Sequence, residues 1–152
     1  MDWGPHFVEQ VLDVMGERKV VRVRGDVRHV KWGDVDDFWR IEMLFDDEVR
    51  AIASCCEVSY YNPCQWFIIG TEATLHGPER NGRAAQVVIN GPDYELKRST
   101  ATEKLDLHQN LAAHIRTGAE LAISPEHALR VMQVIQAGRD SSDAGQILEV
   151  NI

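Results

Sequence analysis

Residues 35–46 read VDDFWRIEMLFD, and residues 48–59 read EVRAIASCCEVS. In both stretches apolar and polar residues alternate, which is the period of a strand with one buried face. The connection Asp46-Asp47-Glu48 is short and polar, so we expect a tight hairpin between them. Residues 18–30, RKVVRVRGDVRHV, alternate in the same way until Gly25 interrupts the run, where we expect a β-bulge. These stretches predict the centre of an antiparallel sheet.

Shorter strands are expected farther along the chain, because brief apolar runs are separated there by turns rich in Gly, Pro and Asn. A last strand is expected close to the end of the sequence. The expected ranges are 65–69, 73–75, 85–89, 94–97 and 146–150.

Helical periodicity flanks the sheet on both sides. Apolar residues recur at helix spacing over 5–15 and again over 103–117, and each run is followed by a glycine that suits a helix end. Ser124-Pro125-Glu126 has the order of an N-cap, a first-turn proline and a first-turn acid, and Gly145 suits the end of that helix. We therefore predict an α+β fold, a mostly antiparallel open sheet with helices on one face, as a single domain over residues 1–152.

Composition limits the class of partner. The chain has 152 residues with a net charge of -8, and acidic and basic residues are interspersed. This balance argues against nucleic acid as a partner, and no apolar run is long enough to cross a membrane. The odd number of cysteines, Cys55, Cys56 and Cys64, fits no zinc motif and is typical of reduced thiols in a cytoplasmic protein. We expect no metal site.

Phosphate-binding motifs are missing from the sequence. No G-x-G-x-x-G follows a strand, and there is no Walker-type loop or G-x-S-x-G elbow. The glycines at positions 70, 77 and 82 mark turns between strands. We therefore expect no cofactor to bind to this chain alone.

Asp2 and His6 are the best candidates for chemistry, in the sequence Asp2-Trp3-Gly4-Pro5-His6. A carboxylate can orient a nearby imidazole and stabilise its cation, which a general base needs when it takes a proton from a hydroxyl. The alternative is that Asp2 is only an N-cap, Pro5 a preferred first helical residue and His6 a polar first-turn residue. Spacing alone favours this alternative, because caps are commoner than catalytic pairs.

Several segments together resemble one family, the C-terminal domain of the Gfo/Idh/MocA dehydrogenases. Residues 2–9, DWGPHFVE, resemble the segment D-x-G-x-H-x-x-D at the head of that domain, with Glu9 in place of its last Asp. Residues 66–75, WFIIGTEATL, resemble its strand followed by a glycine turn. The stretch from Ser124 to Gly145 resembles its S/T-P-E-x-A-L helix. The resemblance covers nearly the whole chain.

This resemblance implies a function: the substrate-binding and oligomerisation half of an NAD(P)-dependent sugar or polyol dehydrogenase. His6 would be the catalytic acid/base and Asp2 its partner. A Rossmann domain would supply NAD or NADP and a Lys from a Lys-Pro motif, neither of which this sequence contains. We therefore expect a longer parent chain, and no activity from these residues in isolation.

The resemblance also assigns substrate-binding positions. Residues 60–63, YYNP, correspond to the place where family members present polar and aromatic side chains to sugar hydroxyls. Tyr60 and Asn62 share a parity and are the predicted substrate-binding residues. A turn at a strand end with a packed tyrosine is an equally good interpretation.

Two functional hypotheses follow, and both involve self-association. In the first, the chain is one half of a sugar dehydrogenase. In the second, it is a free-standing, non-catalytic homologue that serves as an oligomerisation or small-molecule-binding module. A broad sheet with helices on one side must cover its other face, so we expect a homodimer or homotetramer through the sheet face.

Overall fold

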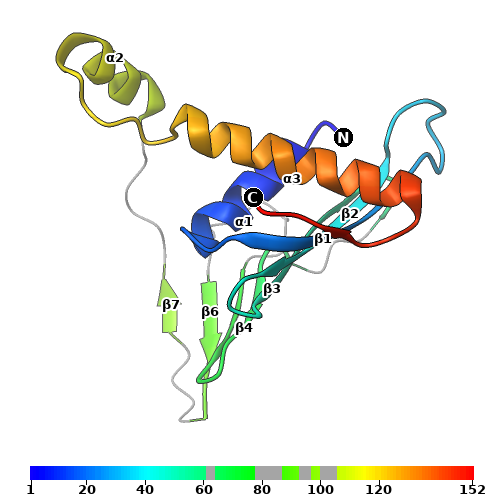
Figure 1. Ribbon diagram of the computed structural model, residues 1–152. Helices are drawn as coiled ribbons and strands as arrows, with labels where there is room; N and C mark the ends of the chain where they lie inside the picture. The colour runs from blue at the N-terminus through cyan, green and yellow to red at the C-terminus, as the bar shows by residue number, and fades with distance from the viewer. Residues whose placement is uncertain (61–63, 78–86, 93–96, 100–105) are drawn as a thin grey trace. The chain divides into compact units, whose positions relative to one another are not determined.

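The computed structural model describes residues 1–60, 64–77, 87–92, 97–99 and 106–152 (Figure 1). Contacts divide the chain into two compact units. The first unit contains Met1–Val58 and Leu121–Ile152, and the second contains Ser59–Glu120. The single domain over residues 1–152 stays a prediction.

The first unit is built on a four-stranded sheet of order β3-β2-β1-β8, in which all neighbours are antiparallel. Its strands are β1 (Val20–Arg28), β2 (Phe38–Phe45), β3 (Arg50–Cys56) and β8 (Leu148–Glu149). The expected acidic hairpin joins β2 to β3, where the Phe45 N–H donates to the Val49 carbonyl at 2.9 Å. Within this turn Glu48 has a φ of 66°.

Two helices, α1 (Gly4–Met15) and α3 (Pro125–Ala144), pack on one face of this sheet (Figure 1). The alternation seen in the sequence sends one set of strand side chains into the interface with these helices, and burying that apolar surface stabilises the unit. The prediction of an α+β fold with an open antiparallel sheet and helices on one face is confirmed. The largest fully buried apolar side chains are Trp39, Phe45, Leu12, Ile41, Met43, Val8, Val20, Val23 and Val134.

Gly25 is not at a bulge, so that expectation was wrong. The pairing of β1 with β2 runs without interruption from Arg22 to Arg28, and the irregularity lies earlier, between Val20 and Arg22. Gly25 is instead the point where α3 passes closest to β1. A Cβ on Gly25 would lie 1.7 Å from the carbonyl oxygen of Gly138. The absence of a side chain at Gly25 allows the backbones to approach so closely, and the absence of one at Gly138 leaves room for the Ile41 side chain, which a Cβ there would meet at 2.8 Å.

Beyond the end of β8, serines of α3 accept hydrogen bonds from the backbone of β1. The last described pair between β1 and β8 joins Val23 to Leu148, so the next donors on that edge of β1 need other acceptors. The Gly25 N–H donates to Ser141 Oγ at 3.0 Å, and the Val27 N–H donates to Ser142 Oγ at 2.9 Å. Helix α3 therefore covers one face of the sheet and also accepts hydrogen bonds from N–H groups at the edge of β1.

The described residues of the second unit form a meander of four short antiparallel strands and one helix. The strands are β4 (Phe67–Ile69), β5 (Thr74–His76), β6 (Val87–Asn90) and β7 (Lys97–Ser99), in the order β4-β5-β6-β7. Helix α2 (Leu107–Thr117) begins at Asp106, whose carboxylate accepts the His108 and Gln109 N–H groups. The predicted positions 85–86, 94–96 and 103–105 lie outside the described residues.

Candidate functional site

A cavity of about 220 Å³ opens in the first unit beside the start of α1. Its walls come from the residues before α1, the loop between β1 and β2, and the neighbouring ends of β2 and β3. The cavity therefore joins segments that are far apart in the sequence, and one of them carries a predicted catalytic residue. The lining residues are Asp2, Trp3, Trp32, Val35, Asp36, Trp39, Cys55 and Glu57.

The loop between β1 and β2 is held by the buried side chain of Asp37. Its carboxylate accepts three backbone N–H groups, from Val30 and Lys31 at 2.6 Å each and from Trp32 at 2.9 Å. Burial raises the pKa of Asp37, but the three donors lower it, and the net result is a pKa below the ordinary value. An ionised Asp37 thus fixes the segment that carries Trp32 into the cavity wall.

Asp37→Asn should lower the melting temperature at pH 7 by at least about 5 °C, because an amide nitrogen would face donors that need an acceptor. The folded pKa lies below the unfolded value of about 3.9, so the carboxylate stabilises the fold above roughly pH 4. This contribution disappears as the pH falls through the lower, folded pKa. In thermal melts the melting temperature should therefore fall less steeply between pH 7 and pH 3 for the variant than for the parent.

The control for this experiment is Asp143→Asn, which removes an exposed carboxylate of α3. It should leave both the melting temperature and its pH dependence nearly unchanged. Equal behaviour of the two variants would contradict the anchoring role of Asp37.

Asp36, beside Asp37, faces a different set of partners. Its Oδ2 accepts from the Met1 amino group at 2.8 Å and pairs with the Arg139 guanidinium, while His29 Nε2 lies 3.2 Å from Oδ1. Burial raises the pKa of Asp36, but the Met1 amino group, Arg139 and His29 lower it, and the net shift is downward. Asp36 is thus a charge-compensated wall of the cavity.

An aromatic row connects His6 to the cavity. The His6 and Trp3 ring centroids are 5.9 Å apart, Trp3 stacks on Phe7 at 6.2 Å, and Phe7 lies 5.9 Å from Trp39. Trp3 and Trp39 both line the cavity, so His6 contacts one of the lining residues without lining the cavity itself. The imidazole itself is exposed.

Asp2 and His6 flank the same wall but are not bonded to each other. Asp2 lines the cavity, and among the described residues no hydrogen bond or ion pair joins the two side chains. The interpretation of Asp2 as an N-cap was wrong, since the cap position is Trp3 and no side chain caps α1. Pro5 does lie in the first turn, as expected. The catalytic roles of Asp2 and His6 stay predictions.

The predicted substrate-binding pair does not belong to the first unit. Tyr60 is fully exposed and belongs to the second unit, and Asn62 lies outside the described residues. Their roles stay predictions as well. Sequence reasoning missed Trp32, Asp36 and Glu57 as cavity residues, because they lie in a loop and just beyond a strand end, where periodicity gives no facing information. The one available signal was the cluster of aromatic and acidic residues at positions 32–39.

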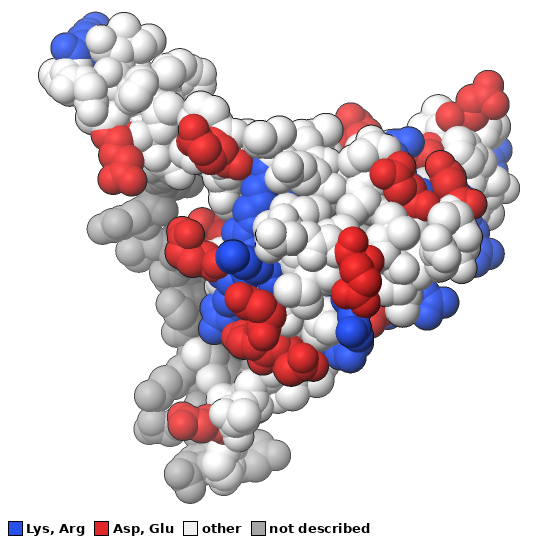
Figure 2. All heavy atoms as spheres, in the orientation of Figure 1, with Lys and Arg blue, Asp and Glu red and all other residues white. Residues whose placement is uncertain are grey.

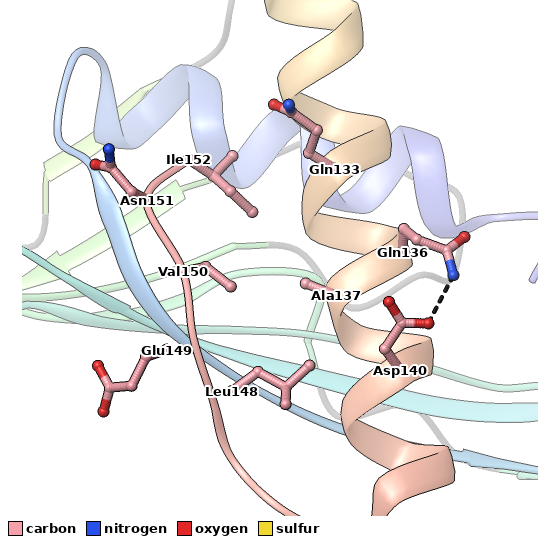
Figure 3. A pocket seen from close by; sticks show the side chains of 9 residues that line it. All are labelled: Gln133, Gln136, Ala137, Asp140, Leu148, Glu149, Val150, Asn151 and Ile152. Atoms are coloured by element: carbon pink, nitrogen blue, oxygen red, sulfur yellow. Dashed lines mark hydrogen bonds between the residues drawn. The ribbon is translucent and has the colours of Figure 1, made fainter.

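A second hollow, of about 470 Å³, lies between α3 and the C-terminal segment (Figure 3). Leu148, Val150 and Ile152 point toward α3, and Glu149 and Asn151 point away from it. Its two carboxylates are already engaged: Asp140 accepts from Gln136 at 2.8 Å, and Glu149 pairs with Arg22 at 2.7 Å. The lining therefore offers no proton-transfer pair, and the cavity beside α1 is the better candidate site.

The described residues do not fit a dinucleotide. Such cofactors place their phosphates on free N–H groups at a helix start. Here Asp106 and Ser124 accept the first N–H groups of α2 and α3, and α1 has a proline in its first turn. Among the described residues no cluster of three or more His, Cys, Asp or Glu could hold a metal ion.

Cys55, Cys56 and Cys64 form no disulfide, and Cys55 is buried while its neighbour Cys56 is half-buried, as expected for adjacent residues on opposite faces of a strand. In the part of the chain that the structure describes, no helix is long and apolar enough to cross a membrane.

Solved structures of larger proteins share this fold. An NAD-binding protein from Listeria innocua superposes with a TM-score of 0.82 at 18% identity, over 97% of this chain and 46% of its own. An aldose-aldose oxidoreductase from Caulobacter crescentus, solved with glycerol, gives 0.78 at 15% identity, over 97% and 46%. An oxidoreductase from Agrobacterium radiobacter, in complex with NAD⁺, L-tartaric acid and magnesium, gives 0.75 at 15% identity, over 96% and 47%. The chain thus spans about half the length of these proteins.

The sequence comparisons agree with the fold. No curated protein sequence matches this chain. The family model described as the GFO/IDH/MocA C-terminal domain matches residues 1–76, half of the 152-residue chain. The chain therefore belongs to the GFO/IDH/MocA C-terminal domain family.

Proposed function

We propose that this chain is the substrate-binding half of an NAD(P)-dependent dehydrogenase that acts on a sugar or polyol. The observation that carries the proposal is the cavity beside α1, in which Asp2 shares a small, tryptophan-rich space whose outer wall contacts His6. Indole faces stack on the apolar faces of sugar rings, and carboxylates accept hydrogen bonds from hydroxyls. The free thiols fit the cytoplasmic location that the proposal includes.

In this proposal the chain's residues handle the substrate and its proton. His6 accepts the proton of the hydroxyl that is oxidised, and Asp2 stabilises the resulting imidazolium once substrate draws the two side chains together. Such contacts are often looser before substrate binds. NAD or NADP, held by a nucleotide-binding domain outside these residues, would supply the oxidant.

The test is to join the chain, at its N-terminus, to the nucleotide-binding domain of a structurally similar oxidoreductase. The fusion should reduce NAD⁺ or NADP⁺ with at least one sugar or polyol from a broad panel. The isolated chain should reduce neither nucleotide. Turnover by the isolated chain, or a fusion that binds NAD⁺ and a polyol but never turns over, would contradict the proposal.

A free-standing binding module is the second candidate. It is favoured by one observation, namely that among the described residues no hydrogen bond joins Asp2 to His6. In that case the cavity would bind a small polyol without oxidising it. Polyol binding by the chain, together with an inactive but nucleotide-binding fusion, would select this alternative.

We further propose that copies of the chain associate through the outer face of the four-stranded sheet. Exposed arginines and acids alternate there, with Arg22 paired to Glu149 at 2.7 Å, and Arg50 lying 3.6 Å from Glu42. Figure 2 shows acidic and basic side chains interspersed on the one face of the molecule that is in view. Such a mixed face can pair with a second copy of itself about a two-fold axis.

Ile52→Arg should break this association. Ile52 is opposite Glu42 in the register of β2 and β3, and 49% of its surface is exposed. A two-fold interface places the added charge twice in one contact, where it must lose its water. Light scattering should give a dimer or tetramer for the parent and a monomer for the variant. Leu129→Arg, on the exposed side of α3, should leave the mass unchanged, and a monomeric parent would contradict the proposal.

A further inference from the structure

The cavity beside α1 has an unbalanced charge. Its lining contains the carboxylates of Asp2, Asp36 and Glu57 and no Lys, Arg or His. In a chain with a net charge of -8 an acidic patch is unremarkable, but here the three acids line one cavity. The electrostatic potential at a bound ligand depends on which of the three acids already has a cationic partner.

Only Asp36 is compensated. It pairs with two cations, the Arg139 guanidinium and the Met1 amino group, so the three carboxylates and these two cations leave one net negative charge at the cavity. Glu57 accepts a hydrogen bond from the Cys55 thiol at 3.2 Å, and no cation lies within ion-pair distance of Glu57 or Asp2 among the described residues. Asp2 and Glu57 are thus exposed carboxylates at the cavity without an ion-pair partner in the described part of the chain.

Indole rings form the remaining polarised surface. Trp3 and Trp32 are 41% and 50% exposed, and the buried Trp39, which is 2% exposed, closes the back of the cavity. The face of an indole carries partial negative charge, so it attracts C–H groups and ammonium ions and repels anions. The indole faces and the carboxylates of the cavity thus both favour cations over anions.

We infer that this cavity selects uncharged or ammonium-bearing polyols and rejects those that carry a carboxylate or phosphate. An ionised carboxylate only accepts hydrogen bonds, so Asp2 and Glu57 can bind hydroxyl and ammonium donors but offer nothing to an anion. The inference rests on the proposed function, since it names the class of substrate for the same site. It adds a charge preference that the proposed chemistry alone does not require, because His6 could take a proton from a neutral or an acidic sugar.

The test compares three sugars that share one ring: glucose, glucosamine and glucuronate. The isotope-labelled chain is titrated at low salt near neutral pH, and the indole N–H signals of its four tryptophans are followed by NMR. The signals of Trp3, Trp32 and Trp39 should shift, and that of Trp66, which does not line the cavity, should not. Glucosamine should bind at least as tightly as glucose, and glucuronate about tenfold more weakly or worse.

Two variants test the cause of the preference. Glu57→Gln should raise the affinity for glucuronate several-fold while changing that for glucose little. Asp143→Asn removes the same charge from an exposed position on α3 outside the cavity and should change neither affinity. Equal or tighter binding of glucuronate by the parent chain overturns the inference, and so does a failure of all three sugars to shift the cavity tryptophans.

The outcome is separable from that of the proposed function. A fusion that oxidises only acidic or phosphorylated sugars would uphold the dehydrogenase and overturn the charge preference. Selective binding of neutral sugars by a chain whose fusion is inactive would uphold the preference and contradict the dehydrogenase.

Discussion

Gly25→Ala should destabilise the first unit by more than about 4 kcal/mol, the largest effect expected of any single methyl group in this chain. The added Cβ would lie 1.7 Å from the Gly138 carbonyl oxygen and 2.6 Å from its carbonyl carbon. These atoms are helix backbone, so they cannot swing away as the end of a side chain could. Relief requires α3 to shift away from β1.

That shift would break more than one contact. The Gly25 N–H would lose Ser141 Oγ, the neighbouring Val27 N–H would lose Ser142 Oγ, and the apolar interface between α3 and the sheet would open. Urea unfolding followed by circular dichroism should show either a much lower midpoint or no cooperative transition.

Gly145→Ala is the matched control, because Gly145 ends the same helix. It has a φ of 65°, and a Cβ added there would meet nothing within 4 Å, so alanine at this position introduces backbone strain but no clash. It should cost about 1 kcal/mol. Both variants restrict the unfolded chain equally, and only Gly145→Ala adds backbone strain, so the difference between them is a lower bound on the cost of the clash. Similar losses in the two variants would rule out the close approach of Gly25 to Gly138.

The same glycine marks the limit of prediction from sequence. Alternation predicted the strands that became β1, β2 and β3, because one face of each strand is buried and its side-chain period is fixed. Capping residues placed the start of α3 at Ser124 and its end at Gly145. Gly25 was interpreted as a bulge because a bulge is a local cause, whereas its real cause is Gly138, a residue distant in the sequence that no local pattern could connect to it.

The candidate site divides in a similar way. Resemblance to a family pointed to Asp2 and His6, and the structure places both at one wall of a cavity. Asp36 and Asp37 are adjacent acids that look alike in the sequence, yet one pairs with Arg139 and the other accepts three backbone N–H groups. Such roles depend on which elements meet around a loop. These elements are distant in the sequence, so no periodic pattern in a single sequence predicts the contacts between them.

His6→Ala should lower kcat of the fusion enzyme by roughly a hundredfold or more, the usual scale when a general base is lost. The substrate hydroxyl must lose its proton as the carbon is oxidised, and His6 is the exposed imidazole that contacts the Trp3 wall of the cavity. Because His6 does not itself line the cavity, the dissociation constant of a polyol should change by only a few-fold. A large fall in kcat with nearly unchanged binding is the signature of a group that acts in the transition state.

His108→Ala provides the matched comparison, since His108 is also an exposed histidine in the first turn of a helix, at the start of α2. It should leave kcat and polyol binding unchanged. Asp2→Asn should lower kcat less than His6→Ala does, because an amide still accepts one hydrogen bond but cannot balance the charge of an imidazolium. If His6→Ala kept full turnover while the fusion still bound NAD⁺ and substrate, His6 would be a surface residue that packs on Trp3, and the base would have to be sought in Asp2 or in the nucleotide-binding domain.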